Sequence, residues 1–167
     1  MSGAVECWRQ KGRFSVSLDF KKTMNLQRNT EACYVCGPAN PAGLHIHFQP
    51  DGEGGSLARY TARKEHCGWP GLLHGGVAFA LMDEALAYAL YFQELFGVTA
   101  RAETHFRQPI SEGMKLTIRA TMVERKRRLI TARAEIRTDD ARRTLLANTE
   151  ATMYIQESAE DPPPAAK

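Results

Sequence analysis

The sequence predicts an α+β fold in which one antiparallel sheet of about six strands curls around a single long helix. Three observations predict it: residues 75–96 are rich in strong helix formers, two segments of alternating polarity precede them, and four more such segments follow. Alternation of this kind is typical of antiparallel sheets with one covered face and one wetter face. At 167 residues, the chain is long enough for one such domain with its own apolar core.

The chain before the helix is expected to supply a loop and two strands. Glycine and proline pairs predict a loop over residues 33–43, and residues 44–49 then alternate between apolar and polar side chains. After a turn at residues 51–55, residues 55–63 alternate in the same way. These two alternating segments are predicted to pair as neighbouring strands.

The long helix is predicted over residues 75–96, and Gly97 is well placed to end it at the C′ position. Its residues are apolar nearly all round, so most of its sides should be buried. The one interruption is the acidic pair Asp83-Glu84, because residues 77–92 contain no other charged side chain. Burying acids in such a run is costly unless a partner compensates them.

Four strands are predicted after the helix, over residues 100–107, 114–122, 130–137 and 145–155. The joints between them are short enough for hairpins or simple turns. A sheet of this kind has an open edge and a wetter outer face. We therefore expect it to pair with another copy of the chain, as a homodimer or a homotetramer.

The chain divides into an N-terminal arm (1–30), one domain (31–156) and a disordered tail with three consecutive prolines (157–167). The first twenty residues carry charges and lack the apolar stretch of a signal peptide. The longest apolar run holds two carboxylates and is short for a membrane span. Four cysteines are too few for a disulfide framework in a chain of this size. These features predict a cytoplasmic protein without a membrane partner.

The net charge of +3 hides a basic region, because residues 101–143 hold twelve Lys or Arg against six Asp or Glu. One interpretation is a set of solvated strand faces, and the other is a surface that attracts a polyanionic small molecule or nucleic acid. No aromatic residue interrupts the basic run at residues 125–128, so a stacking platform for nucleic acid is not indicated.

The sequence His74-Gly75-Gly76 stands where the predicted helix begins, and a helix start presents backbone N–H groups without intrahelical partners. Glycines there can simply serve a tight turn. Alternatively, Gly75 lets a substrate carbonyl approach these donors, which would stabilise an oxyanion. Asp83 follows on nearly the same helix face as Gly76, seven residues later, where it is either a buried structural acid or a catalytic one. Glu84 lies about a hundred degrees further round, so the two acids should not share a site, and one is expected to pair with Arg or Lys.

Two cysteines and two histidines could supply metal ligands before the helix: Cys33, Cys36, His45 and His47. Zinc favours such ligands, but the spacing between the thiols and the imidazoles is not a standard one. The alternative is that the cysteines are small apolar residues packing a loop, and Cys67 is interpreted in the same way.

Several motifs resemble the hotdog-fold acyl-CoA thioesterases, most closely the phenylacetate-pathway (PaaI-like) branch. The signature is Gly71-Leu72-Leu73-His74-Gly75-Gly76 followed after six residues by Asp83. Two further segments are similar to stretches common in that superfamily, namely Cys33-Tyr34-Val35-Cys36-Gly37-Pro38-Ala39-Asn40-Pro41-Ala42-Gly43-Leu44 and Arg107-Gln108-Pro109-Ile110. The resemblance covers residues 33–156 and implies a hotdog fold, which agrees with the predicted order of strands and helix.

The resemblance implies hydrolysis of a small or medium acyl-CoA by a homo-oligomer that needs no metal or redox cofactor. Asp83 is implied as general base or nucleophile and the Gly75 backbone N–H as oxyanion donor, with His74 in support and Gly76 beside the substrate. Arg127 and Arg128, at an expected hairpin tip, are either a solvated turn or contacts to the phosphates of coenzyme A. Two alternative functions are a non-catalytic acyl-CoA-binding protein and a hotdog dehydratase, which needs a histidine beside the acid.

Overall fold

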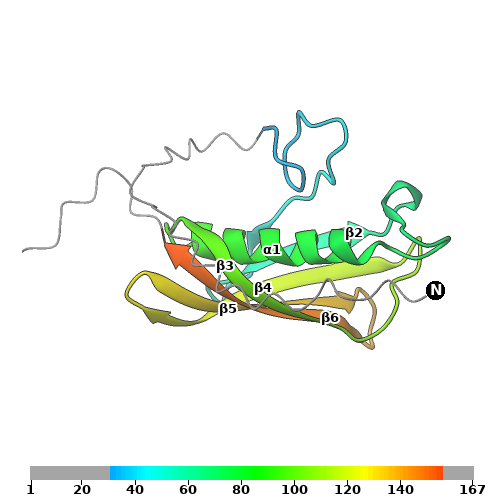
Figure 1. Ribbon diagram of the computed structural model, residues 1–167. Coiled ribbons are helices and arrows are strands. Elements are labelled where there is room, and N and C mark those ends of the chain that lie inside the picture. Colours follow the sequence, from blue (N-terminus) through cyan, green and yellow to red (C-terminus); the bar gives the residue numbers. More distant parts are fainter. Residues whose placement is uncertain (1–30, 156–167) are drawn as a thin grey trace, which may run out of the picture.

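The helix α1 (Gly75–Tyr91) lies across one face of a six-stranded antiparallel sheet, as Figure 1 shows for the computed structural model, which describes residues 31–155. The strands are β1 (Gln49–Pro50), β2 (Ser56–Thr61), β3 (Gly97–Phe106), β4 (Lys115–Lys126), β5 (Leu129–Thr138) and β6 (Leu145–Ile155), and a short 3-10 helix η1 (Lys64–His66) precedes α1. Their order in the sheet is β1-β2-β4-β5-β6-β3. The predicted α+β class is confirmed. The predicted arm and tail lie outside the described residues.

The core forms between α1 and the inner face of the sheet. One helix face is fully buried, at positions spaced by three and one along the chain: Ala78, Leu81, Met82, Ala85, Leu86, Ala89 and Leu90. It packs on the alternate, inward side chains of β4 and β5, which are buried as predicted. The opposite helix face, which carries Asp83 and Glu84, is only half-buried within one chain. The prediction that most sides of the helix are buried is therefore confirmed in full only for the face that packs on the sheet.

The predicted C-terminal end of the helix is wrong. α1 ends at Tyr91, because Glu94 takes a left-handed backbone conformation (φ 59°) and the Leu95 N–H turns back to the Leu90 carbonyl. Gly97 is the first residue of β3 rather than a helix cap. It has to be small, since a Cβ there would lie 2.9 Å from the Leu90 side chain and 3.0 Å from the Tyr154 carbonyl oxygen.

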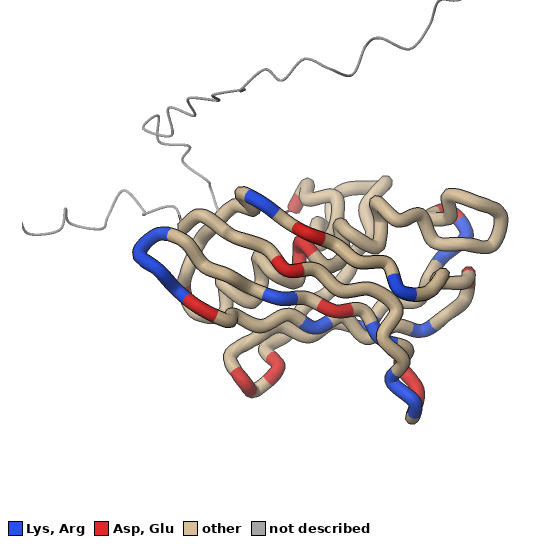
Figure 2. Tube along the Cα trace, turned by 60° about the horizontal axis from the view of Figure 1, so that its bottom comes forward, with Lys and Arg blue, Asp and Glu red and all other residues tan. Residues whose placement is uncertain are grey.

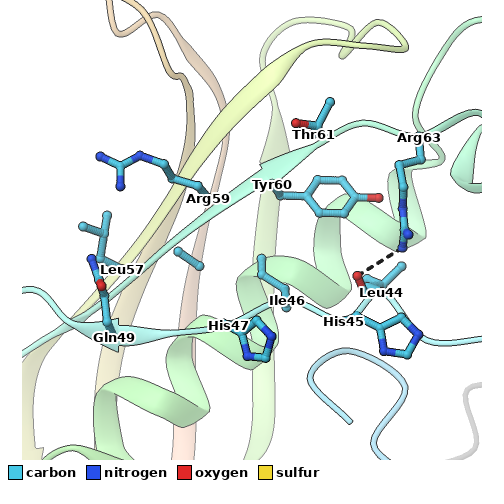
Figure 3. Close-up of a pocket in the computed structure, with 11 residues that line it drawn as sticks. Leu44, His45, Ile46, His47, Gln49, Leu57, Arg59, Tyr60, Thr61 and Arg63 are labelled. Carbon is cyan, nitrogen blue, oxygen red and sulfur yellow. Dashed lines mark hydrogen bonds between the residues drawn. The ribbon is translucent and has the colours of Figure 1, made fainter. Parts of the chain in front are cut away.

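The strand predicted over residues 44–49 pairs with β2 only at its end, where Gln49 faces Leu57 and Pro50 faces Ser56. Leu44 and Ile46 point into the core as expected, but their N–H groups bond to the carbonyls of Tyr34 and Val35 in the preceding loop. The segment therefore separates from β2. A cavity of about 380 Å³ lies between them, and Figure 3 shows the side chains that line it.

The segment between β3 and β4 is a crossover and not the predicted hairpin or simple turn, because β3 pairs with β6 at the edge of the sheet. The crossover also bonds to the loop that leads into α1. Leu73 N–H donates to the Ile110 carbonyl at 2.9 Å, and Glu112 N–H donates to the Gly71 carbonyl at 2.9 Å. The approach to the helix start is thus fixed by residues that follow the helix in sequence.

Strand faces deviate from the predicted alternation in two places. A register shift between Thr99 and Arg101 leaves Ala100 exposed in β3. A second shift lies between Ile136 and Arg137 of β5, opposite the start of β6. Leu146 is buried there, although strict alternation with Leu145 and Ala147 predicts that it lies on the more solvated face. Such bulges add a residue to one strand and reverse the side on which later side chains lie.

The outer face of the sheet carries charges of both signs, and Figure 2 shows basic and acidic segments alternating along the strands. Many of them form ion pairs, such as Arg133 with Glu150 at 2.7 Å and Arg137 with Glu135 at 2.8 Å. This pairing favours solvated strand faces over a surface for a polyanion. None of the helices in the described part of the chain has both the length and the apolar content needed to cross a bilayer.

The turn between β1 and β2 is held by one buried carboxylate. Asp51 Oδ1 accepts hydrogen bonds from the N–H groups of Glu53 and Gly55 at 2.8 Å, and Oδ2 accepts from Arg119 Nε at 3.0 Å. Burial alone would raise the pKa of Asp51, but these backbone donors and the guanidinium outweigh it and lower the pKa below its usual value.

Replacing Asp51 by Asn is expected to lower the free energy of unfolding by about 2 kcal/mol at neutral pH, because hydrogen bonds to an ionised group are worth about that much. The pKa of Asp51 is lower in the folded chain than in the unfolded chain, where it is about 3.9. The stabilisation by the Asp51 carboxylate is therefore fully present above the unfolded-state pKa, and it is lost as the pH falls through the folded-state pKa. Urea denaturation from neutral to acidic pH measures both.

Glu53→Gln is the matched control, because Glu53 also contacts Arg119, at 2.6 Å, but its side chain is 74% exposed. It should change the free energy of unfolding by about 0.5 kcal/mol or less. Equal losses in the two variants, or a loss for Asp51→Asn that persists at acidic pH, would contradict the role given to Asp51.

Candidate active site

The start of α1 is capped by a histidine. His74 is the N-cap residue, and its Nδ1 accepts the N–H of Gly76 at 2.9 Å. Its own N–H donates to the His66 carbonyl at 3.0 Å, so the cap is tied to η1. A side-chain cap of this kind stabilises a helix by about 1 kcal/mol. His74 thus supports the first helical turn.

Of the two glycines, Gly75 is the one whose N–H remains open to a ligand. The N–H of Gly76 is taken by His74, and those of Val77 and Ala78 bond to the His74 carbonyl. Within residues 31–155, no acceptor is recorded for the Gly75 N–H. Gly75 is exposed, and a Cβ there would meet only the Phe106 ring, at an ordinary 3.6 Å. The dipole of α1, which is positive at the N-terminal end of the helix, also favours the binding of an anion at this point.

Asp83 lies on the half-buried helix face, and Thr99 of β3 holds it. The Thr99 hydroxyl donates to Asp83 Oδ1 at 2.6 Å, which leaves Oδ2 available to another group. Sequence reasoning missed Thr99, because it stands just before the alternation that marked the strand and nothing in its neighbourhood indicates a contact with the helix.

Gly75 and Asp83 do not meet at one reacting atom within a single chain. They are eight residues apart on the same helix, which corresponds to about 12 Å along its axis. An oxyanion donor has to lie about 3 Å from the developing charge. The helix therefore carries the two predicted groups but keeps them at separate points of its surface.

Glu84 points away from Asp83 to a pair of thiols. The predicted pairing of one acid with Arg or Lys is wrong for Glu84: among the described residues, its recorded hydrogen-bond partners are the thiols of Cys33 and Cys36, with Cys33 Sγ 3.7 Å from Oε1. Burial, with Glu84 beside it, raises the pKa of the Cys36 thiol to about 12. The predicted histidine partners are elsewhere, since His45 and His47 line the exposed cavity of Figure 3.

A smaller cavity of about 220 Å³ begins at Glu84, one residue after Asp83. Its lining is mostly apolar and aromatic: Glu84, Ala87, Tyr88, Tyr91, Leu95, Phe96 and Gly97. The sequence did not indicate it, because Leu95, Phe96 and Gly97 were assigned to the end of the helix. They instead turn back over the helix as β3 begins.

Arg127 and Arg128 form the two-residue tip of the β4–β5 hairpin, as predicted. Arg127 has a left-handed backbone (φ 56°), and Arg128 Nη1 donates to the Tyr154 hydroxyl at 3.2 Å. The Arg128 carbonyl accepts from Ile155 N–H, and Ile155 pairs with Gly97 beyond the C-terminal end of α1. The tip therefore lies at the opposite end of the helix from Gly75, and one chain does not bring the two together.

Comparisons with known proteins show which family and fold this chain resembles. A family model described as the thioesterase superfamily matches residues 70–145. An uncharacterized protein of Schizosaccharomyces pombe is 31% identical over 74 residues, which is 42% of each chain. The crystal structure of a thioesterase superfamily protein is 27% identical with a TM-score of 0.66, over 71% of this chain and 60% of the other.

Two further solved structures share the fold. A mutant of the phenylacetic acid degradation protein PaaI from Thermus thermophilus is 25% identical with a TM-score of 0.60, over 66% of this chain and 93% of the other. The smu.793 protein of Streptococcus mutans UA159, whose structure is bound to acetyl CoA, is 16% identical with a TM-score of 0.61, over 66% and 88%. At that identity the likeness shows the fold alone.

The chain spans less than half the length of the curated relative and 60% of the first of these structures. The matched segment nevertheless contains the helix start, Asp83 and, in whole or in part, strands β3 to β6. The comparisons agree with the resemblance that the motifs indicated: residues 70–145 match the model of the thioesterase superfamily, and solved structures of that superfamily and of PaaI share the hotdog fold of this chain.

Proposed function

We propose that this protein hydrolyses a small or medium acyl-CoA thioester to the free acid and coenzyme A. The observation that carries the proposal is the open N–H of Gly75 at a capped helix start, on the same helix as the acid Asp83, which is held by Thr99. The family match supports thioester chemistry, and the acetyl CoA in a protein of the same fold supports the class of substrate.

In the proposed reaction, the thioester carbonyl oxygen accepts the Gly75 N–H, which stabilises the negative charge that develops on it. Asp83 either removes a proton from the attacking water or attacks the carbonyl carbon itself to give a mixed anhydride that water then cleaves. Thr99 fixes the carboxylate through Oδ1 and leaves Oδ2 to act. The thiolate of coenzyme A leaves and takes up a proton.

His74 and Gly76 have positioning roles in this proposal. Nδ1 of His74 is occupied by the Gly76 N–H, so His74 orders the first turn and keeps the Gly75 donor in place. A Cβ at Gly76 would lie 3.0 Å from that Nδ1, so glycine lets the imidazole close over the turn. This occupation disfavours the dehydratase alternative, which needs a histidine free to exchange protons beside the acid.

The reaction requires a second copy of the chain, because about 12 Å of helix separates Gly75 from Asp83. In a two-fold dimer, a contact between one residue of the first subunit and another residue of the second occurs twice, once in each direction. If two helices pack antiparallel through their half-buried faces, Gly75 of one copy meets Asp83 of the other. The same packing brings the hairpin tip of one copy to the Gly75 end of its partner. The aromatic cavity beyond Asp83 is then the proposed site of the acyl group, including aromatic ones.

Two pairs of variants test the proposed groups. Gly75→Pro removes the N–H at the first helical position, where proline is well tolerated, and the extended backbone of His74 suits a following proline. Its matched control, Gly75→Ala, keeps the N–H. We expect kcat with an acyl-CoA panel to fall about a hundredfold or more in Gly75→Pro, in line with the loss of an oxyanion donor, and little in Gly75→Ala.

Asp83→Ala should abolish turnover while the circular dichroism spectrum stays unchanged. Glu84→Gln should keep kcat within a few-fold and change mainly KM, because Glu84 lines the cavity proposed for the acyl group. If Glu84 proves essential and Asp83 does not, the assignment moves to Glu84. If the folded wild-type chain binds acyl-CoA but hydrolyses none of the panel, the non-catalytic alternative holds.

Mixing the two inactive variants tests whether the site is shared. A mixed dimer of Gly75→Pro and Asp83→Ala chains has one intact site if Gly75 and Asp83 come from different copies, and none if they act within one copy. After unfolding and refolding of an equimolar mixture, we expect about a quarter of wild-type activity from random pairing. The separately refolded variants are the control. No recovery, or an active monomer by light scattering, would refute the shared site.

Replacing Arg127 and Arg128 together by Ser should raise KM for an acyl-CoA by about tenfold at most, since exposed contacts are each worth roughly 1 kcal/mol or less. It should leave KM for the matching acyl-pantetheine unchanged, because that substrate lacks the nucleotide phosphates. The effect should shrink as salt rises. Arg142→Ser with Arg143→Ser removes the same charge from another turn and serves as the control. Equal changes for both substrates would identify the tip as a solvated turn.

A further inference from the structure

A second group of chemically active side chains lies on the same helix as Asp83 but outside the proposed thioesterase chemistry. The sulfurs of Cys33 and Cys36 and a carboxylate oxygen of Glu84 all lie within 4.8 Å of one another. Two of these residues come from the loop before β1 and the third from the middle of α1. Two thiols and a carboxylate form a ligand set that suits zinc.

One edge of the group has the length expected in a tetrahedral zinc site. Zinc lies about 2.3 Å from thiolate sulfur and about 2.1 Å from carboxylate oxygen, so the sulfur–oxygen edge of a tetrahedron measures about 3.6 Å. The distance between Cys33 Sγ and Glu84 Oε1 is 3.7 Å. A cation can therefore enter between these two ligands without a change in their separation.

The loop holds the Cys33 sulfur in a fixed place. The N–H groups of Val35 and Cys36 point to that sulfur at 3.3 and 3.5 Å. Gly37 closes the loop through its N–H to the Cys33 carbonyl at 3.0 Å. A Cβ at Gly37 would lie 2.4 Å from the Cys33 nitrogen, so only glycine fits this tight turn.

The charge balance of the group also favours a cation. Glu84 is half-buried, and in the described part of the chain its recorded hydrogen-bond partners are the weakly donating thiols of Cys33 and Cys36 rather than Lys or Arg. Cys36 is 6% exposed. A half-buried carboxylate between two sulfurs is costly to keep without a compensating positive charge.

We propose that Cys33, Cys36 and Glu84 bind one Zn²⁺ per chain, with water as the fourth ligand. On binding, each thiol releases one proton to solvent and no electron is transferred. The ion joins the loop of residues 33–43 to α1 one residue beyond Asp83. It replaces the ligand set suggested by the sequence, because Glu84 stands where His45 and His47 were expected. The ion holds the loop against the helix beside the cavity proposed for the acyl group, which Glu84 also lines, and does not contact the thioester.

The test uses the full chain, reduced and stripped of metal with a chelator, in a background where Cys7 is replaced by Ser so that the remaining thiols are the three described ones. After incubation with Zn²⁺ and gel filtration in metal-free buffer, we expect one Zn²⁺ per chain. Titration with Co²⁺ should give a thiolate-to-metal charge-transfer band and the strong visible bands of a four-coordinate ion. Uptake in weak buffer should release about two protons per metal.

Cys33→Ser and Cys36→Ser should each abolish retention of the metal, and Glu84→Gln should weaken it by about tenfold or more. Cys67→Ser is the matched control and should bind like the parent chain, since its thiol bonds to the Arg63 carbonyl at 3.6 Å, outside the group. Zinc should raise the melting temperature of the parent but not of the Cys33 variant.

Failure of the reduced parent chain to retain Zn²⁺ would overturn the proposal, whether or not the variants fold. So would a cobalt spectrum that Cys33→Ser leaves unchanged, or one that Cys67→Ser removes. None of these measurements depends on hydrolysis, so the metal site and the proposed thioesterase activity can fail independently.

Discussion

The burial of one face of α1 by the curved sheet is the contact on which the rest of the structure depends. Fully buried side chains such as Leu81, Met82, Leu86 and Leu90 fix the rotation of the helix against β4 and β5. Each contributes roughly 1.5–3 kcal/mol when it leaves water. Because the helix cannot turn about its axis, every polar group it carries points in a fixed direction.

That fixed rotation explains how two adjacent acids acquire different surroundings. Asp83 and Glu84 leave the helix about a hundred degrees apart. Asp83 meets a hydroxyl from β3, whereas Glu84 meets the sulfur of a loop that precedes the sheet. Neighbouring carboxylates in one apolar run are thus separated by the helix itself. We propose chemistry for one and metal binding for the other on that basis.

The elements and their buried faces could be predicted from the sequence, because alternation and helix propensity are local properties. The alternating residues of β4 and β5 are buried as predicted, and the helix begins at Gly75. The helix end could not be predicted, because Glu94 adopts a left-handed backbone conformation that glutamate rarely takes. The same holds for Leu44 and Ile46, whose N–H groups had two possible partners and bond to the preceding loop instead of to β2.

The candidate site was predicted as a set of residues but not as a geometry. His74, Gly75 and Asp83 follow from a motif, and the capping bond between His74 and Gly76 agrees with it. Thr99, the aromatic cavity and the contact between Glu84 and Cys33 join parts of the chain that are distant in sequence, so no local pattern marks them. The rise of the helix, rather than any residue type, sets the separation of Gly75 from Asp83.

The place of β3 in the sheet has a consequence for the order in which the molecule assembles during synthesis. Within the described residues, β3 has one strand partner, β6, so Phe106 pairs with Ala147 across a long stretch of chain. Contacts of such sequence separation form late, because a large loop must close first. On the ribosome, β3 emerges soon after α1 but waits for the last strand of the sheet. We therefore expect the hydroxyl of Thr99 to be held firmly against Asp83 only after β6 has paired with β3, and the pair to be loose in a nascent chain halted before β6.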